Sequence, residues 1–195
     1  MLSNLNKYKV ILGSNSPRRR ELLAGLDVSF DVQVIPGIEE SYPESLKAEA
    51  VPEYLARKKA AAYMDMVSHS ENVLLITADT IVWTFDEIMG KPADREEAIQ
   101  MLLRLSEHVH EVVTGVCVMT KEKQVSFSVS TAVSFTKLSK EDIIYYVDKY
   151  RPFDKAGAYG VQEWIGYIGV EAINGSFYNV MGLPVQRLYK ELLDF

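Results

Sequence analysis

The 195-residue sequence predicts an α/β fold in which helices flank a mixed β-sheet. Continuous apolar runs such as residues 73–76 have the length and composition of buried strands. Between such runs lie helical segments with capping residues, as at Ser16 and Pro17. The charged turn at residues 121–123 is short enough to join antiparallel strands, whereas strands joined through a helix are typical of parallel pairing. Together these observations predict a sheet with both kinds of connection.

Strands and helices are expected to alternate from the start of the chain. The expected elements are a strand at residues 7–12 ending at Gly13, a helix beginning at Ser16-Pro17, a strand at residues 31–35, an acidic loop at residues 39–44 and a helix at residues 52–67. The first helix has one apolar face, because Leu22, Leu23 and Leu26 are spaced i, i+1 and i+4.

The same mixture continues to the C-terminus. The expected elements are strands at residues 73–76 and 81–85, a helix from Asp94 through Leu105, two or three strands across residues 112–120 and 124–136, a helix at residues 143–147 and a last helix after Pro184. Asp94 and Glu97 form an acidic version of a capping box, and Ser139 with Asp142 caps the next helix. No repeat, low-complexity block or linker divides the chain, so we expect one domain spanning residues 1–195.

Composition and charge exclude several classes of protein. The chain has 21 Lys and Arg against 27 Asp and Glu, a net charge of −6, which argues against non-specific binding to long nucleic acids. No apolar stretch approaches the roughly 20 residues that span a bilayer, and the N-terminus lacks the apolar core of a signal peptide. The single cysteine, Cys117, lies in an apolar run and is expected to be a small buried hydrophobe. We therefore expect a cytoplasmic protein without a membrane partner.

The sharpest local feature is residues 13–20, Gly-Ser-Asn-Ser-Pro-Arg-Arg-Arg, between a strand and a helix. The N-terminus of a helix attracts phosphate, because its first backbone N–H groups are unpaired. Ser14 and Ser16 add hydroxyl groups, and an arginine can bind phosphate through two parallel N–H donors. Arginines in the first turn oppose the helix dipole, and an anionic partner removes that conflict. The alternative is a capped helix whose solvated arginines pair with Glu39 and Glu40.

Two further segments carry charged side chains where a ligand could bind. Asp79 follows the apolar strand at residues 73–76, at the strand end where α/β folds usually bind ligands. Its carboxylate suits a divalent metal that bridges phosphates, or a proton acceptor for an attacking water; a turn-capping aspartate is the alternative. Lys91 lies in a Gly-Lys-Pro loop whose backbone is restricted, although an ordinary surface lysine also fits that pattern.

A tight segment rich in small residues spans residues 154–162, Asp-Lys-Ala-Gly-Ala-Tyr-Gly-Val-Gln. Its glycines permit close approach of the backbone, and Lys155 and Gln162 are the polar side chains that such a loop would present. A glutamine amide offers a donor and an acceptor together, which suits reading the edge of a base. The alternative is a turn with a solvated lysine.

Taken in order, these segments resemble the motifs of the Maf family of nucleoside triphosphate pyrophosphatases, also called septum formation proteins. The motifs are Ser-x-Ser-Pro-Arg-Arg, Ala-Asp-Thr, Gly-Lys-Pro, Asp-Lys-Ala-Gly-Ala-Tyr-Gly-x-Gln and Gly-Leu-Pro, and the resemblance runs from about Lys9 to the C-terminal helix. It implies a fold similar to the inosine triphosphatases, with two lobes around a cleft. It also implies cleavage of a nucleoside triphosphate to the monophosphate and diphosphate with the help of Mg²⁺ or Mn²⁺.

The resemblance also assigns site residues. It implies that Asp79 is the catalytic proton acceptor and that Glu40 is one of the charged residues lining the cleft. The carboxylates of Asp79 and Glu40 suit metal and base work, and we expect both to hold the metal. The residues that the resemblance places on the substrate are Ser14, Arg18, Arg19, Lys59, Thr80, Lys91, Lys155 and Gln162. His110 matches a recurrent family histidine, for which structural support is the expected role.

Arg18, Thr80 and Gln162 match the branch of the family that acts on dTTP and UTP, whereas the branch acting on 7-methyl-GTP tends to carry Trp, Gln and Glu. One departure is Glu107, where family members usually have Gly, which puts the geometry of that turn in question. We therefore expect a dTTP/UTP pyrophosphatase in which water attacks with metal assistance. The alternatives are a pyrophosphatase for other or modified nucleotides and a non-catalytic nucleotide-binding regulator of cell division. A homodimer is a further expectation of the resemblance, without support of its own in the sequence.

Overall fold

A computed structural model describes residues 2–195, and this part of the chain divides into two compact units. The first unit comprises the residues up to Asp79, Thr114–Val129 and Gly182–Phe195, and the second comprises Thr80–Val113 and Ser130–Met181. The strands β3 (Val73–Thr84), β5 (Val109–Met119) and β6 (Gln124–Phe135) contribute residues to both units. The chain therefore passes from one unit to the other within each of these three strands.

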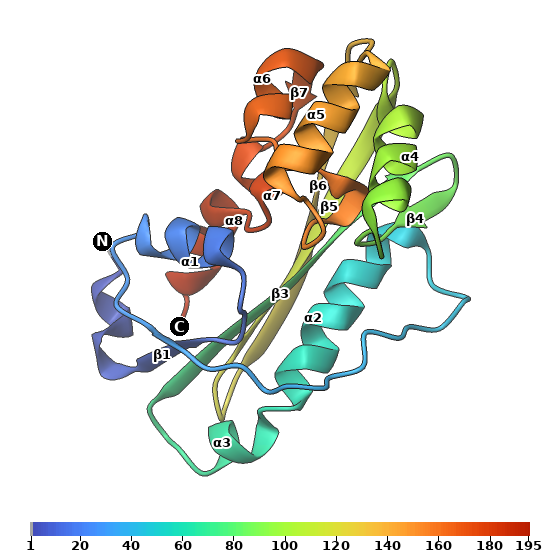
Figure 1. Cartoon of the computed structure of the whole chain (residues 1–195). Helices are drawn as coiled ribbons and strands as arrows, with labels where there is room; N and C mark the ends of the chain where they lie inside the picture. The colour runs from blue at the N-terminus through green and yellow to red at the C-terminus, as the bar shows by residue number, and fades with distance from the viewer. Residues whose placement is uncertain (1) are drawn as a thin grey trace. The chain divides into compact units, whose positions relative to one another are not determined.

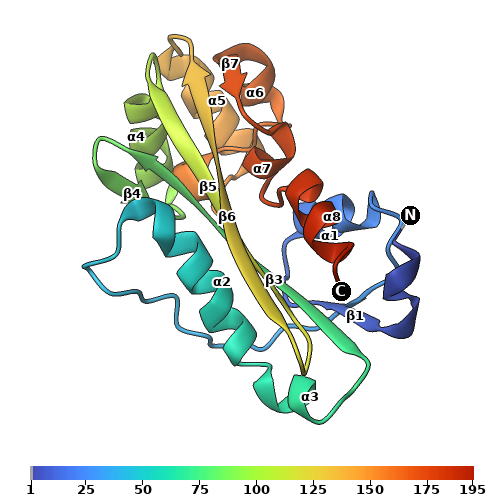
Figure 2. The same cartoon turned by 180° about the vertical axis from the view of Figure 1, so that it is seen from behind.

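In the first unit the strands follow the order β2-β1-β3-β5-β6. The other elements of this unit are η1 (Ser3–Lys7), β1 (Lys9–Leu12), α1 (Pro17–Ala24), β2 (Asp31–Val32), η2 (Ala48–Ala50), α2 (Val51–Ala61), α3 (Met64–Ser68) and α8 (Val185–Leu192). Strand β1 is parallel to both β2 and β3. Figure 1 shows α2 alongside β3, and Figure 2 shows α1 beside α8. The loop between β1 and α1 therefore begins at the carboxyl end of a parallel strand.

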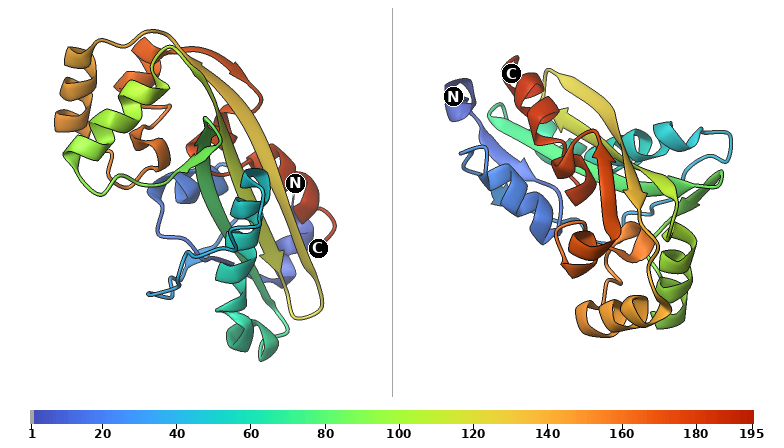
Figure 3. Two further views of the ribbon diagram at one scale, coloured as in Figure 1. Left: turned by 90° about the vertical axis from the view of Figure 1, so that its right-hand side faces the viewer. Right: turned by 90° about the horizontal axis from the view of Figure 1, so that it is seen from above.

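Apolar side chains cover both faces of the sheet in the first unit. The core on one face consists of Ile11, Ala56, Ala60, Tyr63, Val67, Val73, Leu75, Cys117 and Met119. Its strand members have odd numbers, because alternate side chains of a strand point to the same face. The even-numbered Leu12, Leu74 and Val118 are also buried and point to the other face, on the side where α1 and α8 lie (Figure 3). Cys117 is buried as predicted, and burial raises the pKa of its thiol to about 11.

In the second unit the strands follow the order β3-β5-β6-β7, with β4 paired to β3. The other elements are β4 (Glu87–Met89), α4 (Arg95–Leu105), α5 (Lys140–Tyr150), η3 (Ala156–Ala158), α6 (Trp164–Gly169), β7 (Val170–Asn174) and α7 (Phe177–Met181). Both β4 and β7 pair antiparallel with their neighbours, and α4 contacts α5. With the parallel strands of the first unit, these pairings confirm the predicted mixed sheet flanked by helices.

The predicted helix caps are confirmed. The backbone N–H of Glu97 donates to Asp94 Oδ1 at 2.9 Å at the start of α4. The Glu97 side chain in turn accepts from the backbone N–H of Ala93 at 2.6 Å. At the start of α5 the N–H of Asp142 donates to Ser139 Oγ at 3.0 Å. Short-range signals therefore located these helix starts correctly.

Other boundaries differ from the predictions. The strand expected at residues 31–35 is only Asp31–Val32, and the helix expected at residues 52–67 is broken into α2 and α3 around Tyr63. The strands expected at residues 73–76 and 81–85 are one strand, β3, which pairs with β1 near its start, with β4 near its end, and also with β5. The sequence analysis also missed β4, α6, β7 and α7. Within the described residues, no helix has the length and apolar character needed to cross a membrane.

The turn at Glu107, where family members usually have Gly, has a strained backbone conformation that a glycine would adopt without strain. Glu107 has a φ of 65°, in the left-handed region that residues with a Cβ rarely adopt. Its backbone N–H donates to the carbonyl of Thr136 at 3.1 Å, which helps to hold this conformation. The turn therefore keeps a left-handed geometry although the residue is not glycine.

Candidate active site

The loop after β1 and the start of α1 form the first part of the candidate site. Ser16 caps α1, accepting from the backbone N–H of Arg19 at 3.4 Å, and Pro17 occupies the first turn, as predicted. Ser14 is buried, and its Oγ accepts from the backbone N–H of Ser16 and from Arg19 Nη1, each at 3.3 Å. Because both bonds use lone pairs of Ser14 Oγ, the hydroxyl can still donate its proton to an incoming acceptor.

Arg19 ties this loop to two other segments of the first unit. Its Nη1 donates to the carbonyl of Ala78 in β3 at 2.9 Å, and its Nε donates to the carbonyl of Gly182 at 2.8 Å. Burial lowers the pKa of the guanidinium from its usual value; the carboxylate of Asp79 opposes this effect and the charge of Arg18 adds to it. Arg19 therefore organises the site as well as adding positive charge to it.

The neighbouring arginines are arranged differently. Arg18 is partly exposed in the first turn of α1. Arg20 donates from Nη2 to Asn15 Oδ1 at 2.5 Å. Glu40 pairs with Lys59 at 2.7 Å, and its charge also acts on Arg19, where it raises the pKa of the guanidinium against the effect of burial. The expectation of a solvated side chain is wrong for Arg19, because the carbonyls of Ala78 and Gly182 accept hydrogen bonds from its guanidinium.

Asp79 lies within β3 and not beyond its end, which corrects the sequence prediction. Strand β1 pairs with residues 73–76 of β3, and β4 pairs with residues 82–84. Asp79 therefore lies between the two pairings, where β3 continues past the carboxyl end of β1. Its carboxylate is nearly buried, with 8% of the residue exposed. The strand holds this side chain more rigidly than a loop would.

Lys59, in the last turn of α2, joins two acidic side chains. Its Nζ contacts Glu40 Oε1 at 2.7 Å and also makes a very short contact with Asp79 Oδ1. The side chains of Lys59 and Asp79 are 15% and 12% exposed, whereas that of Glu40 is 48% exposed. Three segments that are distant in the sequence thus bring a cation and two carboxylates together within the first unit.

This pair of carboxylates fits a divalent cation that also binds substrate. Among residues 2–195 there is no cluster of three or more His, Cys, Asp or Glu side chains that could hold a metal ion without other ligands. Mg²⁺ commonly binds through one or two carboxylates, completed by substrate phosphates and water. Glu40 and Asp79 supply such a set, since both carboxylates contact one lysine nitrogen.

In the second unit, the loops that carry Lys91 and Lys155 are joined. The backbone N–H of Gly157 donates to the carbonyl of Gly90 at 3.0 Å. Gly157 has a φ of 68°, and a Cβ there would lie 2.9 Å from Val82, so this close approach requires glycine. The predicted restriction of the two loops is therefore confirmed for their backbones.

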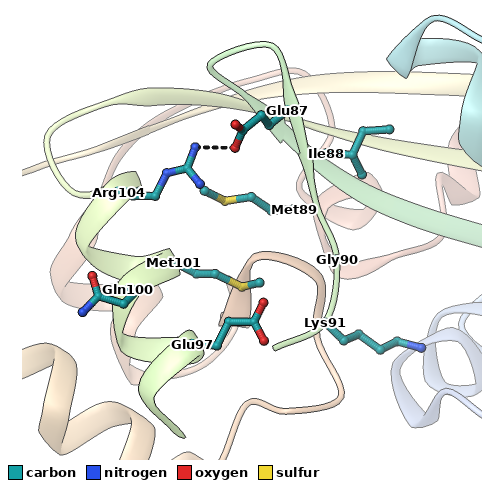
Figure 4. Close-up of a pocket in the computed structure, with 9 residues that line it drawn as sticks. All are labelled: Glu87, Ile88, Met89, Gly90, Lys91, Glu97, Gln100, Met101 and Arg104. Carbon is teal, nitrogen blue, oxygen red and sulfur yellow. Dashed lines mark hydrogen bonds and ion pairs between the residues drawn. The ribbon is translucent and has the colours of Figure 1, made fainter. Parts of the chain in front are cut away.

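Lys91 and Lys155 differ in burial. Lys91 is exposed beside a pocket between β4 and α4, and Figure 4 shows its side chain pointing away from the others that line this pocket. The ion pair of Arg104 and Glu87, at 2.7 Å, lies at the other end of the same pocket. Lys155 is buried, with 7% of the residue exposed, and contacts Asp154 Oδ1 at 2.8 Å and Glu163 Oε1 at 3.2 Å.

The predicted specificity residues Thr80 and Gln162 also belong to the second unit. Thr80 follows Asp79 in β3 and is partly buried. Gln162 precedes α6, and its Oε1 is buried without a hydrogen-bond partner among the described residues. A buried acceptor without a donor costs free energy, which a ligand that donates a hydrogen bond would recover.

His110 supports the core of the second unit, as expected. It is buried, its Nε2 lies 2.7 Å from the hydroxyl of Tyr159, and its ring packs edge-on against Phe135. Burial lowers the pKa of His110 to about 4, so the imidazole is neutral at physiological pH. Neither geometry nor charge gives it a part in the chemistry.

The sequence analysis missed Glu163, which contacts Lys155, and Tyr146, which contacts Glu163. Tyr146 is fully buried in α5 and donates its hydroxyl proton to Glu163 Oε2 in a very short hydrogen bond. No motif links these residues to Lys155. Their separation in the sequence is bridged only by the packing of α5 against the loop before α6.

The chain is similar to known proteins over almost its whole length. The family model for Maf-like proteins matches residues 9–195. A dTTP/UTP pyrophosphatase from Parabacteroides distasonis is 67% identical over 195 residues, covering all of both chains. Proteins with the same description from Phocaeicola vulgatus and Porphyromonas gingivalis are 58% and 56% identical and cover 98% or more of both chains.

Among solved structures, that of a HAM1 protein from Coxiella burnetii aligns with 96% of this chain and 100% of its own. The sequence identity is 15% and the TM-score is 0.49. A score of this size does not establish a shared fold.

Proposed function

The chain belongs to the family of Maf-like proteins, and from that premise we propose that it hydrolyses dTTP and UTP to the nucleoside monophosphate and diphosphate. Relatives as similar as 67% over the full length carry the description dTTP/UTP pyrophosphatase. The observation in this chain that carries the proposal is the group of Lys59, Glu40 and Asp79, joined through Arg19 to the start of α1. It combines carboxylates for proton and metal work with cations for phosphate.

In the proposed reaction, water attacks the α-phosphorus and the diphosphate leaves with the bridging oxygen. Asp79 accepts the proton of the attacking water, since its carboxylate is held by Lys59 on a rigid strand. Glu40 and Asp79 would hold a Mg²⁺ or Mn²⁺ ion, which would neutralise charge on the phosphate oxygens. Lys59 keeps the two carboxylates together and stabilises negative charge that builds up in the transition state.

The proposed substrate contacts divide between phosphate and base. The residues assigned to the phosphates are Ser14, Arg18, Arg19, Lys59, Lys91 and Lys155. Ser14 has a hydroxyl proton to donate, and a helix N-terminus with arginines attracts a polyanion. Thr80 and Gln162 are assigned to the base: the N3–H of uracil or thymine is a donor of the kind that Gln162 Oε1 lacks.

We propose that residues 1–195 act as one catalytic domain, that the protein acts in the cytoplasm, and that it forms a homodimer without binding long nucleic acids. Light scattering on the purified protein tests the dimer, and a monomer across micromolar concentrations would contradict it.

A substrate panel tests the proposed activity. The purified protein is given dTTP, UTP, the other common nucleoside triphosphates and modified nucleotides, with Mg²⁺ or Mn²⁺, and diphosphate release is measured. We expect dTTP and UTP to have the highest kcat/KM, and Asp79→Asn to reduce kcat by about 10²–10⁴-fold. Preference for another nucleotide would overturn the substrate assignment. Tight nucleotide binding without turnover would overturn the enzymatic function.

A further inference from the structure

Lys155 is held between two carboxylates of unequal exposure. The side chain of Asp154, at 2.8 Å from Lys155 Nζ, is 57% exposed, whereas that of Glu163, at 3.2 Å, is 20% exposed. Solvent and ions compete strongly for an exposed partner and weakly for a buried one. The contact to Glu163 is therefore the more durable of the two.

Glu163 is itself anchored through its second oxygen. Its Oε2 accepts the hydroxyl proton of the buried Tyr146, and the oxygen of Tyr146 accepts from the backbone N–H of Gly160 at 3.0 Å. Burial raises the pKa of the Tyr146 hydroxyl, and the bond to Glu163 raises it further, so this hydroxyl remains a donor at physiological pH. With one oxygen on Tyr146 and the other on Lys155, the carboxylate cannot rotate without losing both contacts.

The backbone around Glu163 is equally restricted. Its N–H donates to the carbonyl of Gly160 at 3.0 Å, and its own carbonyl accepts from the N–H of Gly166 at 2.9 Å. A Cβ at Gly166 would lie 1.8 Å from the carbonyl oxygen of Val161, and one at Gly160 would lie 2.9 Å from the Glu163 carboxyl carbon. The turn therefore fits closely around the Glu163 side chain.

We propose that Glu163 is a positioning residue, which holds the Lys155 ammonium where it binds a phosphate of the nucleotide. This inference rests on the proposed function. When the substrate binds, Lys155 exchanges the exposed Asp154 for a phosphate oxygen and keeps its contact with Glu163. Tyr146 acts one step further away, by fixing the Glu163 carboxylate. Because Lys155 contacts the phosphate in both the bound substrate and the transition state, its placement affects KM more than kcat.

A double-mutant cycle tests this role. Glu163→Gln keeps the size of the side chain and removes its charge, and we expect it to raise KM for dTTP about tenfold with less than threefold change in kcat. In a Lys155→Met background, the same substitution should change kcat/KM by less than about twofold, because Glu163 then has no lysine to position. Glu163→Asp keeps the charge but has a shorter reach, so it should restore part of the loss.

Two measurements keep the cycle interpretable. The cycle consists of the wild type, Glu163→Gln, Lys155→Met and the double variant. Calorimetric titration of these four proteins with inorganic diphosphate measures the dissociation constant for each without turnover. The matched control is Glu191→Gln, since Glu191 pairs with Arg187 at 2.7 Å and is also 20% exposed, but lies in α8 of the first unit. We expect this control to leave KM within about twofold of the wild type.

The outcomes separate the inference from the function on which it rests. The positioning role would be overturned if Glu163→Gln lowered kcat/KM equally in the wild-type and Lys155→Met backgrounds. It would also be overturned if Glu163→Gln lowered kcat/KM in neither background. A wild-type protein that hydrolyses no nucleotide would overturn the proposed function instead, and the role of Lys155 with it. A rise in KM that occurs only when Lys155 is present, with little change in kcat, supports both the positioning role and the proposed function.

Discussion

Lys59 in the first unit and Lys155 in the second each lie between two carboxylates, yet the buried carboxylates differ in their other contacts. Asp79 contacts Lys59 through Oδ1, and among residues 2–195 no hydrogen bond is recorded for its other oxygen. Glu163 contacts Lys155 through Oε1 and accepts from Tyr146 through Oε2. A carboxylate oxygen without a protein hydrogen bond is more accessible to a proton or a metal, whereas a carboxylate bonded through both oxygens is fixed in orientation. This difference supports our proposals of a catalytic role for the group around Lys59 and a positioning role for the group around Lys155.

The largest expected effect is on enzyme kinetics, when either lysine is substituted. We expect Lys59→Met to reduce kcat for dTTP by about 10²–10³-fold, because it removes a cation from the reacting group and leaves two carboxylates in repulsion. Lys155→Met should act mainly on KM. Steady-state kinetics with both variants distinguish the two roles, and the same kinetic signature for both lysines would remove the distinction.

The second unit should respond to acid through His110. Its pKa is about 4 in the folded state against about 6.5 when unfolded, so the unfolded state binds the proton first as pH falls. The free energy of unfolding should therefore decrease by about 3 kcal/mol from pH 6.5 down to pH 4, and this group should change it no further below that range. Urea unfolding at a series of pH values measures this, with His110→Gln as the comparison. An unchanged slope in that variant would contradict the assignment.

The first unit should be sensitive to crowding between α2, which carries Lys59, and β5. A Cβ at Gly115 would lie 2.2 Å from the backbone of Pro52 and Glu53. We expect Gly115→Ala to lower the free energy of unfolding by about 1–3 kcal/mol, or more if α2 cannot shift. Gly25→Ala is the control, since a Cβ there would meet backbone no closer than 3.4 Å and its φ is −64°. Equal stability of the two variants would show that α2 moves freely.

The smallest expected effect lies at the strained turn of the second unit. Glu107→Gly should raise the free energy of unfolding by about 1 kcal/mol or less, because glycine adopts a φ of 65° without strain but has more freedom in the unfolded chain. Thermal and urea unfolding measure the change, and activity should stay the same. Destabilisation would mean that the Glu107 side chain makes a contribution larger than the strain it imposes.

Local signals predicted a large part of this molecule correctly. Ser16 with Pro17, and Asp94 with Glu97, mark helix starts because a capping bond joins residues only three apart. The predictions failed where an element depends on distant partners. Residues 77–81 were not recognised as part of a strand, because β3 pairs with segments that are distant in the sequence: β1, β4 and β5. The same limit applies to Glu163, whose role depends on Tyr146 in a separate helix.

The sequence by itself determined the mixed α/β class, the main helix starts and, through the order of its motifs, the family. Each of these is encoded by residues that are neighbours in the chain or by motifs whose spacing is preserved along it. Only the tertiary structure decided that Asp79 lies within a strand, that Lys59 joins it to Glu40, and that Lys155 contacts Glu163. Those contacts form because folding brings distant segments together and buries their charges, and a buried charge must find a partner.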